Sequence, residues 1–317
     1  MGRGGPVTGR ATAPQHPVHR LTRRPGAVLL GVLLVIAAGC AAAAPEAGPG
    51  PRASINDEIS IADLEEFFGG GLEFWDHGSF GVDRAELIET AGGAMVRVFY
   101  PAGSASRRAE GEDGGMQVYM RLPDDPVDEL YLQYYVRFPP DFDFVKGGKL
   151  PGLYGGTVTG GQNIPDGTDG FSTRYMWRRG GDGEVYAYLP TSEKHGTSLG
   201  RGCWYFTPGR WTAIQQRVRL NTPGEADGEM TVWQDGWQVL TQTGLTFRTT
   251  DDLKIDGLFF STFFGGGDTS WASPDDQYAD FAAFAVSDGY IPLAAGDGPA
   301  DEDAPEGDEA CGVAGTR

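Results

Sequence analysis

Short segments with apolar or alternating apolar and polar side chains follow one another through most of this chain, separated by glycine- and proline-rich stretches. A period of two is typical of strands, and 50 glycines and 21 prolines suit frequent turns better than long helices. One short helix is expected within residues 57–68, where Ile61, Leu64 and Phe67 or Phe68 have helical spacing. Strands are expected over 95–100, 116–122, 129–138, 211–220, 230–240, 257–264 and 278–286.

This series of elements predicts an all-β fold, a two-sheet β-sandwich of jelly-roll type that forms a single domain over residues 57–292. Asp235-Gly236 predicts a hairpin turn inside the segment 230–240. The segment 257–264 is almost entirely apolar, which indicates a strand covered on both faces. Residues 104–115 are polar and charged and are expected to form a loop.

The N-terminal 40 residues have the pattern of an export signal. Five arginines and no acid precede an apolar run over 27–38, which is too short to span a bilayer as a mature helix. Cys40 directly follows Ala-Gly, an arrangement that resembles the lipobox of bacterial lipoproteins, in which the cysteine is lipidated. The alternative is ordinary cleavage near Ala44, although Pro45 would then follow the cut. We expect an exported protein anchored by lipid to the outer face of a membrane, or secreted.

Two further segments lie outside the expected domain. Residues 41–56 read as a flexible tether, and residues 293–317 as an acidic tail that is expected to be disordered. With Cys40 lipidated, Cys203 and Cys311 remain. In an oxidising compartment this even count predicts one disulfide between them, which would fasten the tail to the domain.

The charge of the chain is strongly uneven along its length. A formal net charge of -19 argues against nucleic acid, because phosphates require a basic surface. Residues 146–219 nevertheless hold ten basic and five acidic residues, a local net charge of +5. Such a region can guide an anion to one site. The alternative is that these charges are scattered over solvated strand faces.

The residues between 170 and 190 are expected to form a hairpin whose strands, 171–178 and 184–189, flank a Gly-Gly-Asp-Gly turn. If even positions pair with even positions, Arg174 lies opposite or diagonal to Tyr188, with Ser172 and Tyr186 close by. One patch would then hold a hydroxyl, a guanidinium and two phenols. The alternatives are an arginine paired with an acid and tyrosines that only pack.

Lys149 lies in the glycine-rich run KGGKLPGLYGG. Glycine allows sharp turns and close approach of the backbone to a ligand. The alternative here is a surface loop that carries a solvated lysine.

Several chemistries lack their residues in this chain. His77 and His195 stand in unrelated contexts, no Cys/His cluster has metal-ligand spacing, and no G-x-S-x-G motif appears. No close pair of strand carboxylates suits glycoside hydrolysis. We therefore expect neither a metal nor a cofactor.

Tyrosine, lysine and arginine without carboxylates suit β-elimination on a uronic acid. Arg174 would neutralise the substrate carboxylate, which makes the neighbouring proton more acidic. A tyrosine whose pKa is lowered by nearby cations would act as base. The second tyrosine, or Lys149, would protonate the departing glycosidic oxygen.

Several segments resemble, in order and spacing, the family 14 polysaccharide lyases, and the resemblance covers residues 95–288. The matching segments are YYVRFPPDFDFVKGGKLPGLYGG, GFSTRYMWR, VYAYLP, LNTPGEADGEMTVWQDG and FFSTFFGGGD. The resemblance implies a β-jelly-roll enzyme that cleaves alginate or glucuronan by β-elimination. It places the functional residues on Lys149, Ser172, Arg174, Tyr186 and Tyr188, and Lys146 of the same motif is expected to contact substrate.

The leading hypothesis is thus a monomeric, lipid-anchored polyuronate lyase. The second is a non-catalytic carbohydrate-binding surface lipoprotein of the same fold, which would bind a polyuronate without releasing unsaturated product. The third is a glycoside hydrolase on a similar sandwich, which would need two carboxylates facing the cleft. The sequence does not indicate which uronate is preferred, or whether cleavage is endo or exo.

Overall fold

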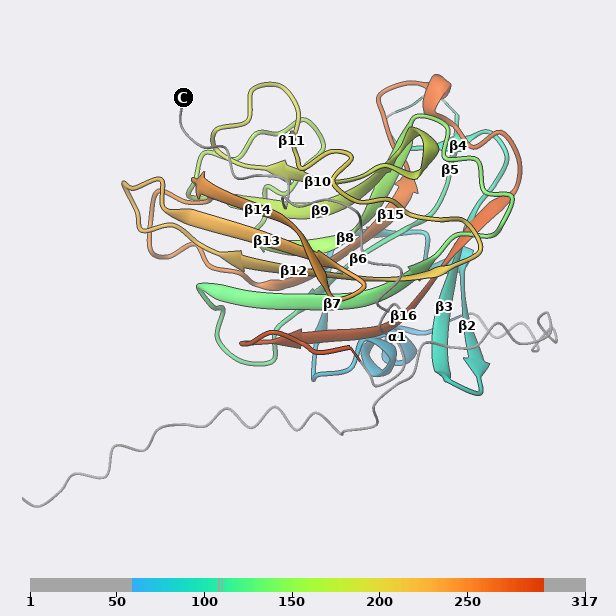
Figure 1. Ribbon diagram of the computed structural model, residues 1–317, viewed down its shortest axis with the longest axis horizontal. Helices are drawn as coiled ribbons and strands as arrows, with labels where there is room; N and C mark the ends of the chain where they lie inside the picture. The colour runs from blue at the N-terminus through green and yellow to red at the C-terminus, as the bar shows by residue number, and fades with distance from the viewer. Residues whose placement is uncertain (1–58, 108, 110, 294–317) are drawn as a thin grey trace, which may run out of the picture. The chain divides into compact units, whose positions relative to one another are not determined.

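Two antiparallel sheets of seven strands each pack into a sandwich (Figure 1). The structure is a computed structural model that describes residues 59–293 except 108 and 110. All described residues belong to one compact unit. The all-β sandwich of jelly-roll type predicted from the strand pattern is therefore confirmed.

Sheet A forms one layer. Its strands, in spatial order, are β1 (Glu73–Phe80), β6 (Met116–Arg121), β15 (Gly257–Phe264), β8 (Gly147–Gly156), β9 (Gly170–Arg178), β10 (Gly183–Tyr188) and β11 (Thr197–Leu199). Sheet B forms the other layer. Its order is β14 (Trp237–Leu245), β13 (Gly228–Gln234), β12 (Trp211–Arg219), β7 (Glu129–Arg137), β16 (Gln277–Ser287), β3 (Gly93–Tyr100) and β2 (Ala85–Thr90).

Short elements connect the strands. The described residues include one α-helix, α1 (Ile61–Phe68), within the range predicted to hold it. Ser60 caps this helix in a capping box with Asp63, and Leu64 and Phe68 anchor it in the core. The remaining elements are the 3₁₀ turns η1 (Val82–Arg84), η2 (Arg179–Gly181) and η3 (Thr269–Trp271), and the two-residue parallel pair β4 (Ser104–Ala105) and β5 (Glu112–Asp113), which lies in the predicted polar loop.

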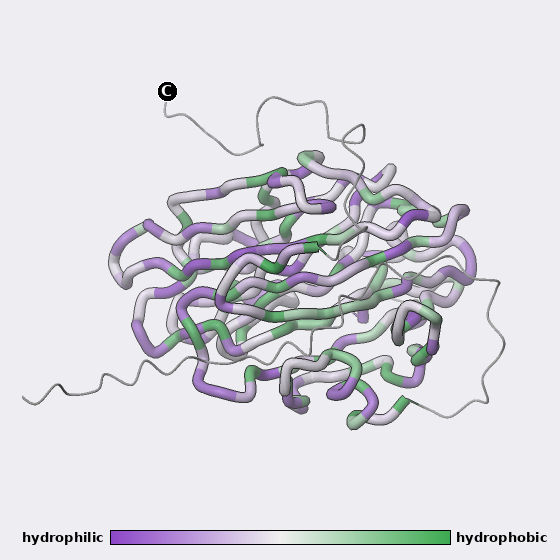
Figure 2. The backbone as a smooth tube through the Cα atoms, turned by 60° about the horizontal axis from the view of Figure 1, so that its bottom comes forward, coloured by the Kyte–Doolittle hydropathy of each residue, from purple (hydrophilic) through white to green (hydrophobic). Residues whose placement is uncertain are grey.

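The hydrophobic core lies between the sheets and follows the strand alternation. On β9, Tyr175 and Trp177 are fully buried in the main core cluster, whereas the side chains of Arg174 and Met176 lie on the opposite face. Hydrophilic residues gather at the loops (Figure 2). The predicted strand 257–264 is β15, and it is buried on both faces along most of its length. The outer face of sheet A therefore also carries covered side chains.

The hairpin predicted at Asp235-Gly236 is confirmed. The two residues connect β13 to β14, and both have positive φ, 49° and 85°. Glycine adopts this conformation at little cost, which is why the pair favours a tight hairpin.

Strand β8 was not predicted from the sequence. The glycine-rich run around Lys149, for which a surface loop was the alternative, is β8, a buried ten-residue strand in the middle of sheet A. Pro151 fits because the register shifts between Leu150 and Gly152, and bulges tolerate proline inside a sheet. Strands β1, β2 and β11 were also not predicted.

Several predicted features lie outside the described residues. These are the signal segment with Cys40, the tether 41–56, and the tail 294–317 with Cys311. Cys203 is disulfide-bonded and packs partly buried against the core. Its predicted pairing with Cys311 stays a prediction. Within residues 59–293, no helix is both long and apolar enough to cross a membrane.

Candidate active site

A cleft of about 700 Å³ lies on the outer face of sheet A. Side chains from β1, β6, β15, β8, β9 and β10 line it, together with the loop 157–163 and the segment 265–271. Neighbouring strands lie about 4.8 Å apart, so a path from β1 to β10 crosses roughly 24 Å of sheet. The cleft can therefore accommodate an extended ligand.

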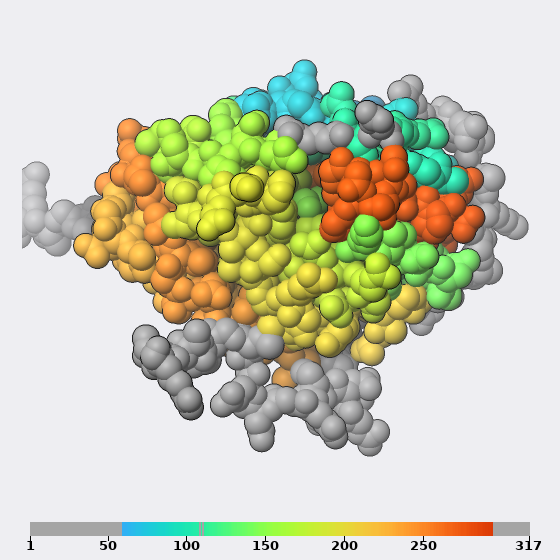
Figure 3. Space-filling view, turned by 90° about the horizontal axis from the view of Figure 1, so that it is seen from above, coloured from blue at the N-terminus to red at the C-terminus, as the bar shows by residue number. Residues whose placement is uncertain are grey.

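One wall of the cleft is built from chain segments far apart in sequence. Ser106 donates a hydrogen bond from its hydroxyl to the Gly266 carbonyl (2.6 Å), and Ser273 N donates to the Ser104 carbonyl (2.9 Å). These bonds join the loop after β3 to the segment around η3, which belongs to the darker orange surface at the right in the view from above (Figure 3).

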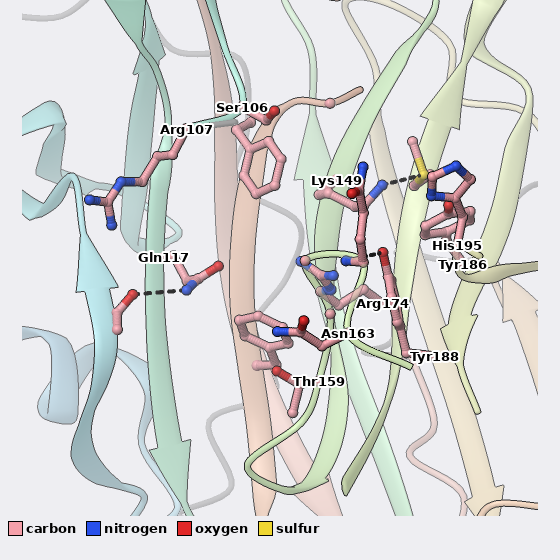
Figure 4. A pocket seen from close by; sticks show the side chains of 18 of the residues that line it. Ser106, Arg107, Gln117, Lys149, Thr159, Asn163, Arg174, Tyr186, Tyr188 and His195 are labelled. Carbon is pink, nitrogen blue, oxygen red and sulfur yellow. Dashed lines mark hydrogen bonds between the residues drawn. The ribbon is translucent and has the colours of Figure 1, made fainter. Parts of the chain in front are cut away.

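The hairpin of β9 and β10 has the register expected from the sequence. Tyr186 pairs with Arg174, and Tyr188 pairs with Ser172. Even positions thus face even positions, and Arg174 lies diagonal to Tyr188. Figure 4 shows Arg174, Tyr186, Tyr188 and Lys149 converging in the cleft.

Arg174 is a buried guanidinium that forms no ion pair with a carboxylate of residues 59–293, apart from the undescribed 108 and 110. Its side chain lies over the Phe259 ring, 4.4 Å from the centroid, and Nη1 donates to the Ser261 hydroxyl at 3.0 Å. Its Nε has no hydrogen-bond partner among the described residues, and the residue is only 4% exposed. Pairing with an acid, the alternative for this arginine, is wrong. Because buried charges are normally paired, this one is suited to receive an anionic ligand.

Lys149 is also buried, and not on a solvated loop. Its Nζ donates to the Met176 sulfur at 2.8 Å and lies 4.1 Å from the Tyr186 ring centroid. Sulfur is a weak acceptor, so the ammonium form gains little from this contact. Burial, and then the charges of Arg174 and Arg178, lower the pKa of Lys149 well below its usual value. The neutral amine, a base, is therefore favoured here.

The two tyrosines differ in their surroundings. Burial raises the pKa of Tyr186 to about 12, although Arg178 opposes the shift. The expectation of a tyrosine with a lowered pKa is thus wrong for Tyr186, because desolvation outweighs the nearby cation. Tyr188 is 5% exposed, and its hydroxyl accepts a long hydrogen bond, 3.4 Å, from the Gln162 backbone N–H. The two rings pack edge to face at 5.7 Å.

Ser172 shares the face of Arg174 but does not line the cleft. It is fully buried and donates to the Thr159 carbonyl at 2.6 Å. The Thr159 hydroxyl in turn bonds the Tyr119 hydroxyl at 2.6 Å. Ser172 therefore holds the loop 157–163 over the sheet, and this loop separates it from the cleft surface.

Lys146 lies at the edge of the site. Its Nζ donates to the Ser270 hydroxyl at 2.5 Å and lies 5.9 Å from the ring centroid of Trp271, which lines the cleft. Arg178 also lines the cleft, but it forms a 2.5 Å ion pair with the buried Glu184. Arg178 is therefore partly neutralised, in contrast to Arg174.

Sequence reasoning missed several residues of the cleft. His77 and His195, which appeared unrelated, both line it, one from β1 and one from the loop before β11. Trp271 and the loop 157–163 were not singled out either, whereas strand alternation places Met176 on the face of Arg174. No motif marks them, since they meet only once the sheet is formed. Across the described part of the chain, no group of three or more His, Cys, Asp or Glu side chains is placed to hold a metal ion.

The family model of polysaccharide lyase 14 matches residues 89–284, which contain the whole hairpin and Lys149. The chain belongs to polysaccharide lyase family 14. This family 14 enzyme is therefore a polysaccharide lyase, and the predicted resemblance is confirmed.

Solved structures agree with this assignment. The family 14 alginate lyase from Aplysia kurodai is 33% identical, with a TM-score of 0.63 over 72% of this chain and 94% of that chain. Two others show the same fold. Alginate lyase Aly36B, solved as a mutant with alginate tetrasaccharide, is 23% identical (TM-score 0.61; 74% and 92% covered). The alginate lyase vAL-1 from Chlorella virus is 24% identical (0.58; 64% and 88%). No curated protein sequence matches the chain.

Proposed function

We propose that this family 14 lyase cleaves a polyuronate by β-elimination, with alginate as the first candidate substrate. The observation that carries the proposal is a buried pair of basic groups in the cleft, Arg174 and Lys149, neither of which forms an ion pair with a described acid, because the nearby Glu184 pairs with Arg178. The 33% identity to the Aplysia alginate lyase supports the choice of substrate.

The reaction begins with the substrate carboxylate against Arg174. Neutralising this carboxylate stabilises the negative charge that develops when the proton on the adjacent carbon leaves. The neutral amine of Lys149 accepts that proton, and the lowered pKa of Lys149 favours this neutral form. The electron pair forms the new carbon–carbon double bond, and the glycosidic carbon–oxygen bond breaks. A proton returned to the leaving oxygen completes the balance.

We assign that last proton to Tyr188. Arg174 lies 6.0 Å from the Tyr188 ring centroid, so the hydroxyl belongs to the same corner of the cleft as the carboxylate site. The Tyr186 ring instead packs against Lys149 and holds the amine in place. This division differs from the sequence prediction, in which a tyrosine was the base and the second tyrosine or Lys149 was the acid.

The remaining predicted residues have supporting roles. Ser172 orders the loop 157–163 above Arg174 through the Thr159 carbonyl. Lys146 and Trp271 would contact a sugar away from the reacting bond, the ring by stacking and the ammonium by charge. Neither residue takes part in the proton transfers.

We further propose that the enzyme acts as a monomer anchored through lipidated Cys40 to the outer face of a membrane. Cell fractionation of a Cys40→Ser variant tests the anchor. The wild type should remain in the detergent-soluble membrane fraction and the variant should leave it. Equal distribution of both would contradict the anchor without affecting the proposed reaction.

The decisive experiment is ultraviolet absorbance of conjugated unsaturated uronate, on alginate, polymannuronate, polyguluronate and glucuronan. We expect the absorbance to rise with at least one polymer. Arg174→Ala should abolish this rise, and the distant surface variant Arg219→Ala should retain it. A flat trace on all four, from folded protein that binds one of them, would favour the non-catalytic binding protein.

A further inference from the structure

A chain of hydrogen bonds crosses sheet A from Arg174 to its far edge. Arg174 Nη1 donates to Ser261 Oγ on β15 (3.0 Å), Ser261 Oγ donates to Gln117 Oε1 on β6 (3.4 Å), and Gln117 Nε2 donates to the Gly78 carbonyl on β1 (2.9 Å). Figure 4 shows Gln117 and its bond to the β1 backbone across the cleft from Arg174.

The direction of this chain follows from its first member. A guanidinium can only donate, so Ser261 must accept from Arg174 and has its single proton left for Gln117. The amide oxygen of Gln117 receives that proton, and its NH₂ group is then left to donate to a carbonyl, which is what Gly78 offers. Each hydrogen bond in this series therefore has one possible donor and one possible acceptor, and the Ser261 hydroxyl has a fixed orientation.

The hydrogen bond from Arg174 to Ser261 spans the intervening strand β8. Strand β8 lies between β9 and β15, and its residue paired with Arg174 is Gly152. The backbones are so close that a Cβ at position 152 would lie 2.6 Å from the Arg174 Cα. Gly152 therefore allows the backbones of β8 and β9 to approach closely beside Arg174.

The Phe259 ring and the Ser261 hydroxyl both contact the guanidinium, and the hydroxyl is the group that fixes its orientation by a hydrogen bond. The Nε of Arg174 has no hydrogen-bond partner among the described residues. Without the Ser261 hydroxyl, the group could rotate over the aromatic ring. A fixed orientation matters because a charged group stabilises a transition state best when it is already positioned toward the developing charge before the reaction.

We propose that Ser261 and Gln117 are positioning residues that orient Arg174 toward the substrate carboxylate. This inference rests on the proposed function, in which Arg174 neutralises that carboxylate. The two residues act through Arg174 and do not take part in proton transfer.

Ser261→Ala is the first test, with Thr262→Ala as its matched control. Thr262 is the next residue of β15, and its buried hydroxyl bonds the Tyr100 hydroxyl at 2.5 Å on the core side. Ser261→Ala removes the hydrogen bonds to Arg174 and Gln117, and Thr262→Ala removes the one to Tyr100, so the control also loses a buried hydroxyl of β15 but leaves the guanidinium untouched. Ser261→Ala should lower kcat/KM about 100-fold, mainly through kcat, as expected for a misplaced charge. Thr262→Ala should keep kcat/KM within about 3-fold at a similar loss of Tm.

Two further variants separate position from stability. Ser261→Thr retains the hydroxyl and should restore activity to within about 10-fold of the wild type. Gln117→Glu places a carboxylate at the end of this series of hydrogen bonds. The new carboxylate should compete with the substrate carboxylate for the Arg174 guanidinium, so KM should rise. A Ser261→Ala effect that Ser261→Thr does not relieve would count against the inference.

The last test combines Ser261→Ala with Arg174→Lys. If Ser261 acts through the guanidinium, the double variant should be no less active than Arg174→Lys alone. The inference would be overturned if the fold-losses of the two single variants multiplied in the double variant, or if Ser261→Ala had the kcat of the wild type. If the wild type forms no unsaturated product from any polyuronate, the proposed function fails. Affinity for an alginate oligosaccharide then decides, and equal Kd values for wild type and Ser261→Ala would overturn the positioning role as well.

Discussion

Lys149 and Arg174 place two basic side chains in one buried corner, and neither forms an ion pair with an acid of the described residues, since Glu184 is paired with Arg178. Such an arrangement costs stability, because desolvation of a charged amine is not repaid by an ion pair. The site tolerates it by favouring the neutral form of Lys149. Burial here is therefore both a structural cost and the origin of the proposed base.

Replacement of Lys149 by methionine should abolish turnover and stabilise the fold. In the wild type the pKa of Lys149 is lower in the folded than in the unfolded chain. Between those two values the unfolded chain binds the extra proton, so the free energy of unfolding rises with pH in this window. Lys149→Met should remove that slope and raise Tm by roughly 2–4 °C for each kcal/mol gained near neutral pH. Thermal melts from neutral pH to pH 10 measure both effects, and a variant less stable than wild type throughout would contradict this account.

Replacement of Tyr188 and of Tyr186 by phenylalanine should lower kcat to different extents. Tyr188→Phe removes the proposed proton donor and should lower kcat by about 100-fold or more. Tyr186→Phe keeps the ring against Lys149 and should cost on the order of 10-fold. Initial rates of unsaturated product at saturating substrate provide the comparison, and a larger loss in Tyr186→Phe would reverse the assignment.

Sequence reasoning reached only part of this corner. Alternation along one hairpin was enough to group Arg174, Tyr186 and Tyr188, because parity alone decides the face of a strand. It could not tell that Ser172 is covered, since the loop 157–163 does the covering. Nor could it predict the pKa of Tyr186 or Lys149, which depends on burial by distant segments.

At the scale of elements, β8 shows that pairing with neighbouring strands can outweigh the low strand propensity of a sequence. Its many glycines and its proline disfavour a strand, yet β15 and β9 pair with it on both sides. The bulge at Pro151 accommodates the missing N–H. By contrast, β15 and the hairpin at Asp235-Gly236 were predictable because local pattern and tertiary setting agree.

Sheet B contains a strong cross-strand connection that the cleft does not use. Asp280 of β16 lies directly opposite Arg97 of β3 and Arg137 of β7. Its carboxylate accepts hydrogen bonds from both, at 2.7 Å each, and is fully buried. One acid therefore joins three adjacent strands.

Asp280→Asn should destabilise the protein by about 3–5 kcal/mol, because it leaves two arginines without their shared charge. Turnover per folded molecule should be retained, since the site lies on the other sheet. Urea unfolding monitored by tryptophan fluorescence measures the loss, with exposed Asp275→Asn as control. Equal midpoints for both variants would contradict the role of Asp280.

At the scale of the whole molecule, the sandwich itself was predictable, because many short alternating segments without long helices admit few architectures. The order of strands within each sheet was not, since pairing partners such as β6 and β15 lie more than a hundred residues apart.

One prediction concerns the ends of the chain. Cys203 is disulfide-bonded, and we expect Cys311 to be its partner. Intact mass of the mature protein after alkylation without reductant should show neither cysteine modified, and a tryptic map should contain the crosslinked pair. Alkylation of Cys311 in folded protein would contradict the pairing.

The opposite faces of β9 have a consequence for how this enzyme can change. Arg174 and Met176 face the cleft while Tyr175 and Trp177 face the core, so neighbouring residues of one strand serve different parts of the molecule. Substitutions at cleft-facing positions other than the catalytic ones can change contacts with the substrate and leave the packing between the sheets intact. A lineage can therefore explore new polysaccharides one residue at a time, without first having to acquire compensating changes in its interior.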